Sequence, residues 1–194
     1  MSLVRIALAG EGGQGVQAVA EILTEAAYNE NKQTIYIPNF GIEQRGGVSI
    51  AFIQVSEERI GAPKFHTADV VIALSERSVS RTAMYSSNDT LFVHDSSFSI
   101  DENIELNAKK ILGLPAIDTS NNELHPKVFN IIIMGAVIGL SNVVSFEAAK
   151  EALESKLMHK FEQNPDLRDL NYKALEIGRK MAEESIKEEV SRNA

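Results

Sequence analysis

Six residues near the start of the chain have the types and spacing of a phosphate-binding loop. They are Gly10, Glu11, Gly12, Gly13, Gln14 and Gly15. They follow an apolar run that predicts a strand and precede an amphipathic segment that predicts a helix, and their glycines fit the G-x-G-x-x-G spacing. Glycine permits a tight turn and a close approach to a ligand, and the free N–H groups of a helix start attract anions. The segment predicts an anion or cofactor contact. The alternative is that the glycines only form a sharp turn and allow close helix–sheet packing.

Two features argue against a dinucleotide in this loop. An NAD site of this kind needs an acidic residue about 20 positions further on, at the end of the second strand. The strand expected there ends at Tyr36–Asn39 without a carboxylate, and Glu11 places a negative charge inside the loop. No Lys-Ser/Thr pair follows the glycines, so a P-loop is excluded as well. A free-standing NAD-type dehydrogenase is therefore a disfavoured alternative, which a nicotinamide titration would test.

A second loop, at residues 38–47, joins the second and third expected strands. Arg45 is its one strong donor, and a guanidinium can fork onto a phosphate or a carboxylate. Gly46 and Gly47 would let a ligand or a partner chain come close. The alternative is that Arg45 forms a local ion pair of little energetic value with Glu43, and that the glycines only turn the chain.

The periodicity of apolar residues predicts the elements that position these loops. Strand-like runs lie at residues 4–9, 34–37, 48–55, 70–74 and 91–93, and a helix is expected at 16–29. Strands that alternate with helices predict an α/β fold with three layers, a mostly parallel Rossmann-like sheet and helices on both faces. Because the carboxyl ends of parallel strands share one edge, we expect the two loops to lie side by side.

The second half of the chain predicts a helical C-terminal part. A nearly all-apolar helix is expected from Pro126 to about Leu140, with Gly135 and Gly139 one turn apart for close packing of a neighbour. Ser145 is expected to cap the next helix. Since there is no internal repeat or low-complexity linker, we expect one domain over residues 1–194, with a last helix that packs on a neighbour.

Composition excludes several classes of function. The chain has 194 residues and a formal net charge of -8, which disfavours nucleic acid and anionic membranes as partners. It has no cysteine, so it forms no disulfide and supplies no thiolate to zinc or to an iron–sulfur cluster. Its longest apolar stretch, residues 131–140, is about half of what spans a bilayer, and no signal peptide is recognisable at its start. A cytoplasmic location is expected.

No catalytic set and no metal site is predicted. His94 and Asp95 follow a strand and could do acid–base work, but such a pair more often forms a strand-end hydrogen bond. The other histidines have no metal-ligand spacing, and no G-x-S-x-G motif surrounds the serines that follow residue 74.

Read together, the two loops resemble the gamma subunit of 2-oxoacid:ferredoxin oxidoreductases. The matching segments are residues 10–15, Tyr36-x-Pro38, residues 41–51, Ile60-x-x-Pro63, residues 69–74, Asn130 and Gly135. The resemblance is clear over about residues 4–140. The Arg-Gly-Gly-x-Ser sequence at residues 45–49 looks more like the 2-oxoglutarate-type members than the pyruvate-type ones. Indolepyruvate and branched-chain 2-oxoacids remain open as substrates.

The resemblance implies one pyruvate/ketoisovalerate oxidoreductase gamma-type domain within a complex that is inactive without its other subunits. Such a complex decarboxylates a 2-oxoacid on thiamine diphosphate with magnesium, forms the acyl-CoA, and passes electrons through iron–sulfur clusters to ferredoxin. Alpha, beta and delta-type subunits are the implied partners, and this chain is expected to hold no cofactor alone. Coenzyme A contacts are expected at Gly10, Gly12, Gly13, Gln14, Gly15, Arg45, Gly46 and Gly47. The alternative is a purely structural or docking subunit.

Overall fold

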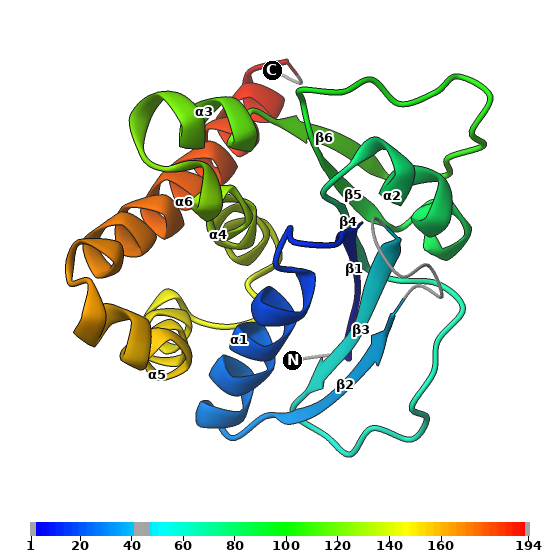
Figure 1. Cartoon of the computed structure of the whole chain (residues 1–194). Coiled ribbons are helices and arrows are strands. Elements are labelled where there is room, and N and C mark those ends of the chain that lie inside the picture. Colours follow the sequence, from blue (N-terminus) through cyan, green and yellow to red (C-terminus); the bar gives the residue numbers. More distant parts are fainter. Residues whose placement is uncertain (1–2, 41–46, 193–194) are drawn as a thin grey trace.

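A computed structural model describes residues 3–40 and 47–192 of the chain (Figure 1). The strands are β1 (Val4–Glu11), β2 (Gln33–Asn39), β3 (Val48–Ser56), β4 (Val70–Ala73), β5 (Leu91–Asp95) and β6 (Lys110–Leu114). The α-helices are α1 (Val16–Asn29), α2 (Glu76–Thr82), α3 (Ala116–Glu123), α4 (Phe129–Ser141), α5 (Phe146–Gln163) and α6 (Asp166–Arg192). Short 3₁₀ helices lie at η1 (Ala83–Tyr85) and η2 (Pro126–Val128).

The strands form one six-stranded sheet in the order β2-β3-β1-β4-β5-β6. The pairs β1–β4, β4–β5 and β5–β6 are parallel, whereas β3 is antiparallel to both β1 and β2. The expectation of a mostly parallel sheet is confirmed. The third strand is the exception, since it runs antiparallel to both of its neighbours. The reason is the connection between β2 and β3, which is too short for the helical crossover that parallel neighbours need, so these strands form a hairpin.

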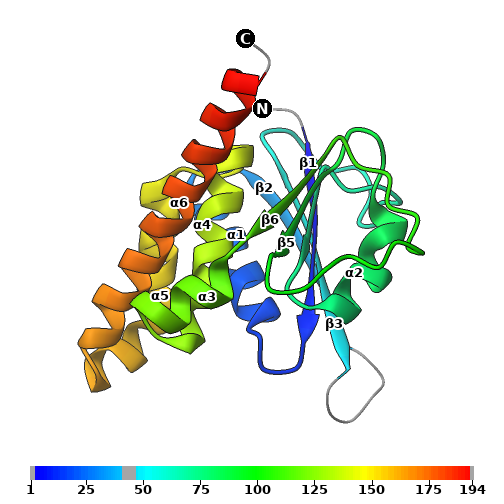
Figure 2. The same cartoon turned by 90° about the horizontal axis from the view of Figure 1, so that it is seen from above.

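Helices cover both faces of the sheet unequally. Figure 2 shows the sheet nearly edge-on, with α1, α3, α4, α5 and α6 on one side and α2 on the other. The alternation of side chains in β1 supplies both cores: Ile6 and Leu8 pack with α1 and α4, whereas Ala7 packs with Val71 and Phe92 on the α2 face. The predicted three-layer α/β fold and the helical C-terminal part are confirmed.

Several local predictions are also confirmed. Helix α1 ends at Asn29, and the apolar helix expected from Pro126 begins as η2 and continues as α4. Ser145 caps α5, because its side chain accepts a hydrogen bond from the Ala148 N–H. The second strand, expected at residues 34–37, is longer in the structure: Pro38 lies inside β2, which tolerates proline because it is an edge strand.

The last helix packs against α4 through glycines of both helices. A Cβ on Gly135 would overlap the Leu175 carbonyl oxygen, and one on Gly178 would lie 2.8 Å from the Ala136 nitrogen. A Cβ on Gly139 would meet Ala182 at 2.8 Å. The predicted close packing at Gly135 and Gly139 is confirmed, and the neighbour is α6 of the same chain. Across residues 3–40 and 47–192, no helix combines the length and hydropathy needed to cross a membrane.

Candidate functional site

The glycine loop lies at the carboxyl end of β1. Gly10 and Glu11 are the last residues of β1, and residues 12–15 connect it to α1. Gly12 and Gly13 are exposed. Gly13 has φ 95°, and nothing lies within 4 Å of the position of a Cβ there. These two glycines therefore form the part of the loop that a ligand or a partner can approach.

Gln14 and Gly10 hold the loop in place. The Gln14 Oε1 accepts a hydrogen bond from the Glu11 N–H at 2.7 Å, and its Nε2 donates to the Leu74 carbonyl at 2.9 Å. Leu74 directly follows β4, so this side chain ties together the ends of two neighbouring strands. A Cβ on Gly10 would lie 2.8 Å from Val16 and 2.9 Å from the Gln14 Oε1. The structure thus gives both residues a packing role.

Gly15 and Asn130 meet at the start of α1. Gly15 is the N-cap residue of α1 with φ 76°, and a Cβ there would overlap the Nδ2 of Asn130. Asn130 lies on α4 and is 8% exposed, and its Oδ1 accepts no hydrogen bond from the part of the chain that the structure describes. Leaving a buried polar group unpaired costs about 1–3 kcal/mol, so this oxygen marks a position where a donor would be favourable.

The first turn of α1 is also fixed to the edge strand. The Tyr36 hydroxyl donates to the Gln17 Oε1 at 2.5 Å. Burial, and then the nearby charge of Glu21, raise the pKa of Tyr36 above its ordinary value, so the phenol stays protonated as a donor.

The second loop begins and ends at the same edge of the sheet as the glycine loop. Val48, the first residue of β3, pairs with Glu11 at the end of β1, and the described ends of both loops lie at the same edge of the sheet (Figure 2). The expectation of side-by-side loops is therefore confirmed at the end of the second loop that begins β3. Gly47 is half-buried at this position. Arg45 and Gly46 lie outside the described residues.

A groove of about 420 Å³ lies between the glycine loop and the helices of the C-terminal part. Residues of the loop, α1, the η2–α4 segment, the end of α5 and the start of α6 line it, and we call it the glycine-loop groove. Its polar lining residues are Gln14, His125, Lys127, Asn130, Lys160 and Asn171, and its apolar ones include Ile22, Leu157 and Phe161. Sequence patterns pointed to the loop itself but not to Lys127 or Lys160. The one sequence feature near Lys127 was Pro126, which directly precedes it and indicated the start of a helix.

The groove carries positive charge in an acidic protein. Lys127 and Lys160 are exposed, and neither ammonium has an ion-pair partner within the described residues. No aspartate or glutamate lines the groove. The His125 Nδ1 accepts a hydrogen bond from the Lys127 N–H at 3.1 Å, so the neutral ring carries its proton on Nε2. The arrangement favours an anionic ligand.

His94 and Asp95 have structural partners. Asp95 is fully buried, and its carboxylate accepts hydrogen bonds from the Ser97 N–H at 2.9 Å and the Ile117 N–H at 2.8 Å. The His94 Nδ1 lies 2.8 Å from the carbonyl oxygen of Asp95. These contacts fix the end of β5 to the start of α3, in agreement with the strand-end interpretation.

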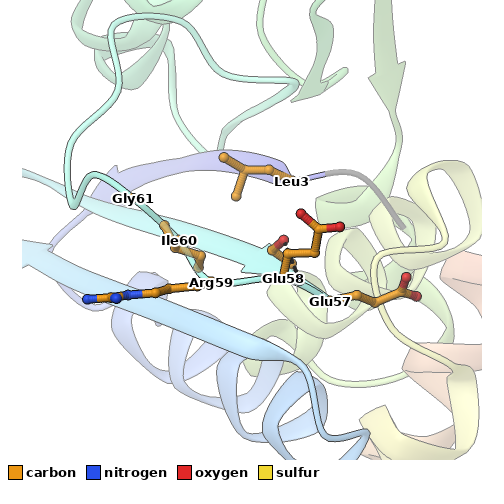
Figure 3. Close-up of a pocket in the computed structure, with 7 residues that line it drawn as sticks. Leu3, Glu57, Glu58, Arg59, Ile60 and Gly61 are labelled. Atoms are coloured by element: carbon orange, nitrogen blue, oxygen red, sulfur yellow. Dashed lines mark hydrogen bonds between the residues drawn. The ribbon is translucent and has the colours of Figure 1, made fainter.

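A second hollow, of about 410 Å³, lies at the opposite end of the sheet, between Leu3 and residues 56–61 (Figure 3). Figure 3 shows the side chains of Glu57, Glu58 and Arg59 extending in different directions. Their charged groups do not converge on one point. Among the residues that the structure describes, no cluster of histidine and acidic side chains could hold a metal ion.

The chain is similar to subunits of one family of oxidoreductases. The family model "Pyruvate ferredoxin/flavodoxin oxidoreductase" matches residues 5–181. Over 189 residues the chain is 32% identical to the 2-oxoglutarate synthase subunit KorC of Archaeoglobus fulgidus, a match that covers 96% of this chain and 92% of KorC. It is 30% identical over 188 residues to the ketoisovalerate oxidoreductase subunit VorA of Methanothermobacter thermautotrophicus, but that match spans only 38% of VorA.

Two solved structures are also similar to this chain. The gamma subunit of keto/oxoacid ferredoxin oxidoreductase from Geobacter sulfurreducens superposes with a TM-score of 0.76 at 27% identity, covering 92% of this chain and 98% of the other. The 2-oxoglutarate:ferredoxin oxidoreductase from Magnetococcus marinus superposes with a TM-score of 0.84 at 22% identity, covering 94% of this chain and 31% of that one. At that identity the second match supports the fold alone.

Proposed function

Because the chain belongs to the pyruvate ferredoxin/flavodoxin oxidoreductase family, we propose that it is the gamma subunit of a multisubunit 2-oxoacid:ferredoxin oxidoreductase. The complex would oxidatively decarboxylate a 2-oxoacid, form its acyl-CoA and pass the electrons to ferredoxin. The observation that carries the proposal is the match with KorC over 96% of this chain and 92% of that subunit. Copurification from the source cell tests it: partners with a thiamine-binding fold and a cysteine-rich ferredoxin domain are expected, and a chain recovered alone would contradict it.

The redox cofactors belong to the partner subunits in this proposal. The sequence contains no cysteine, so thiolates for iron–sulfur clusters must come from other chains. Alpha, beta and delta-type subunits would hold thiamine diphosphate, magnesium and the clusters. The isolated chain is accordingly expected to show no 2-oxoacid oxidation, and adding the partner subunits should restore it.

The contribution of this chain to catalysis would be contact with coenzyme A. Gly12 and Gly13 are exposed, and the loop that contains Arg45 and Gly46 starts and ends at the same sheet edge. An exposed glycine loop before a helix suits a phosphate group, because the first N–H groups of the helix are free to donate. The affinity of the assembled enzyme for coenzyme A should fall on Arg45→Ala or Gly13→Pro. Unchanged affinity in both variants would contradict this contact.

The favoured substrate is 2-oxoglutarate. The Arg-Gly-Gly-x-Ser sequence at residues 45–49 supports it, and KorC is a subunit of a 2-oxoglutarate synthase. Other similar proteins carry the names ketoisovalerate oxidoreductase and pyruvate synthase. An assay of the copurified complex with 2-oxoglutarate, pyruvate, 2-oxoisovalerate and indolepyruvate decides between them, and the highest kcat/KM should belong to 2-oxoglutarate.

A structural or docking role is the second candidate. It is favoured by the packing contacts of Gly10 and Gln14, which explain part of the glycine motif without a ligand. The discriminating observation is whether residues around Gly12 and Arg45 contact coenzyme A or only protein in the assembled complex. Cross-linking with a photoreactive coenzyme A analogue would label this chain only in the first case.

A further inference from the structure

We propose that the open edge of β2 and the aromatic pocket beside it bind an extended, acidic segment of a partner subunit. The segment would continue the sheet beyond β2 and place one apolar side chain in the pocket. The docking surface is inferred from the geometry of this chain. That the partner is another subunit of the same complex rests on the proposed function.

The outer edge of β2 is open. This strand ends the sheet, and within the described residues its backbone hydrogen bonds are made with β3. An edge strand presents unpaired N–H and C=O groups to any extended chain that comes alongside, and proteins commonly protect such an edge with charged side chains. Residues 33–39 contain no charged side chain. Pro38 blocks pairing only near the end of the strand, so the residues before it can accept a further strand.

An aromatic pocket of about 290 Å³ lies on the face of β2 that is turned away from α1. Tyr36 packs into the core on the α1 side, so the alternation of side chains places Ile37 on the opposite face, where it lines the pocket. The ring of Phe52 meets those of Phe65 and Tyr85 edge to face, at centroid distances of 5.6 Å and 5.1 Å. Small-molecule sites have volumes of about 300–1,000 Å³, so this smaller pocket suits a single side chain of a partner.

Two exposed apolar side chains adjoin lining residues of the pocket. Met84, which directly precedes Tyr85, is 74% exposed, and Phe40, which directly follows Asn39, is 68% exposed. Apolar side chains that gather around a pocket at the surface are typical of a protein–protein contact. The apolar area available to a partner is therefore larger than the pocket alone.

The surroundings of the pocket are basic in an acidic chain. The formal net charge of the chain is -8, whereas residues 59–85 contain four basic and two acidic residues. One of these acids, Asp69, is already engaged, because its carboxylate accepts from the Arg5 N–H at 2.7 Å. Lys64 lines the pocket, is exposed, and has no ion pair within the described part of the chain. Charge complementarity therefore favours an acidic segment.

These features together select the kind of partner. In a twofold pair of this chain the same basic surface would meet itself, and like charges oppose such a contact. A small molecule could fill the pocket but would leave the edge of β2 unpaired. An extended segment with an apolar side chain next to a carboxylate satisfies the edge, the pocket and Lys64 at once.

Hydrogen–deuterium exchange of the isolated chain and of the copurified complex tests the strand pairing. The β2 amides that face away from β3 should exchange at least about tenfold more slowly in the complex, because the partner strand accepts hydrogen bonds from them. Strand β6, at the other edge of the sheet, is the internal control. Its amides should change by less than about twofold.

Met84→Lys and Lys64→Glu test the apolar surface and its charge. Each should weaken the association of this chain with the remaining subunits of the complex by about tenfold or more. The matched controls are Met158→Lys, at a methionine 54% exposed on α5, and Lys173→Glu, at an exposed position on α6. Both should stay within about twofold of the wild type. Because all four side chains are exposed, the variants should fold, and a thermal melt of each verifies it before the association is measured.

A carbodiimide cross-link identifies the occupant. The reagent joins the Lys64 amine to a carboxylate in contact with it, forming an amide with loss of water. Mass spectrometry of the linked peptides should show Lys64 attached to a segment of another subunit. Attachment of Lys64 to a second copy of this chain, or a dimer of the isolated chain that Met84→Lys disperses, would overturn the proposed occupant.

The outcomes separate this inference from the proposed function. Protection of β2 in the complex together with weaker association of both variants supports the two proposals. If the wild-type chain assembles with its partner subunits, but β2 exchange is unchanged and both variants associate as well as their controls, the docking surface is overturned and the proposed function stands. A wild-type chain that is recovered alone contradicts both.

Discussion

At the scale of single residues, Gln14 fixes the glycine loop through two side-chain hydrogen bonds. Its amide accepts from the Glu11 N–H and donates to the Leu74 carbonyl, so it replaces a backbone connection between the ends of β1 and β4. The loop therefore keeps its shape without a ligand. This explains why the same segment can serve as a rigid wall for a groove.

Replacing Gln14 with alanine should lower the free energy of unfolding by about 1–3 kcal/mol. Two hydrogen bonds disappear, each worth about 0.5–1.5 kcal/mol net. Urea denaturation of the isolated chain measures the change. The matched control is Gln33→Ala in β2, where the glutamine is exposed, and it should change stability by less than about 0.5 kcal/mol. A Gln14→Ala chain of normal stability whose complex has lost coenzyme A affinity would mean that Gln14 contacts the ligand instead.

Gly15 and Gly13 differ in what surrounds them, and alanine substitutions should reveal it. Both have positive φ, at 76° and 95°, so each Gly→Ala change costs about 1–2 kcal/mol of backbone strain. A methyl at residue 15 would also overlap the Asn130 amide, whereas residue 13 is open. Gly15→Ala should therefore be clearly the less stable variant in the same denaturation assay. Equal losses would contradict the close contact with Asn130.

The residues of the site differ in whether a contiguous stretch of sequence was enough to predict them. The glycine loop could be predicted because its spacing, strand and helix all lie within about one βα unit. Lys127 and Lys160 could not, since they come from η2 and α5, more than a hundred residues further along the chain. A surface lysine in the last turn of a helix, such as Lys160, has an ordinary explanation in the helix dipole. Only the folded arrangement brings it to the same groove as Lys127.

At the scale of elements, the contact between α4 and α6 determines how the helical layer is assembled. Glycines on both helices bring the backbones into direct contact: Gly178 faces Ile132 and Ala136, and Gly135 faces Leu175. Since α4 is buried beneath α6, the position of α6 also sets one end of the glycine-loop groove, where Leu167 and Asn171 lie.

Gly178→Ala should destabilise the chain by about 3 kcal/mol. The new methyl would lie 2.8 Å from the Ala136 nitrogen and 2.9 Å from the Ile132 carbonyl carbon, so the helices must separate. The control is Gly61→Ala, where nothing lies within 4 Å of the new Cβ. Thermal and urea unfolding measure both variants. A Gly178→Ala chain as stable as the control would show that α6 shifts freely on α4.

The elements were predictable where their patterns were strong. The apolar helix with Gly135 and Gly139, the capped helix at Ser145 and the first helix follow directly from periodicity. Strand β6 was not predicted, because Lys110–Leu114 is short and its glycine weakens a strand pattern. The expectation of a parallel sheet did not predict the antiparallel direction of β3. That direction depends on the short connection between β2 and β3.

At the scale of the whole molecule, one charged cluster connects the first helix to the helical half. Glu30 follows α1, and its carboxylate accepts from Lys32 at 2.7 Å and from the Ser145 N–H at 2.8 Å. Lys32 also donates to the Val143 carbonyl at 2.9 Å. The cluster therefore fixes the α4–α5 connection against the end of α1. Because α5 carries Lys160, this connection helps to hold the groove together.

This cluster should make stability fall at acidic pH. Burial alone would raise the pKa of Glu30, but hydrogen bonds from Lys32 and Ser145 outweigh it and hold the pKa below its ordinary value of 4.5. Between those two values the unfolded chain binds more protons than the folded one. The contribution of Glu30 to the free energy of unfolding is thus complete above pH 4.5 and is lost as the pH falls through the folded-state pKa.

Glu30→Gln isolates that contribution. The amide oxygen can still accept from the Ser145 N–H, but the charge that pairs with Lys32 is gone. At neutral pH the variant should be less stable than the wild type, and between about pH 5 and pH 3 its stability should decline less steeply, so that the two curves converge. Urea denaturation across that range measures the slopes. Glu151→Gln, at an exposed position on α5 with no ion pair within the described residues, should follow the wild-type slope. Equal slopes for all three chains would mean that the attachment of the helical half does not depend on this carboxylate and rests on the apolar packing of α1, α4 and α5.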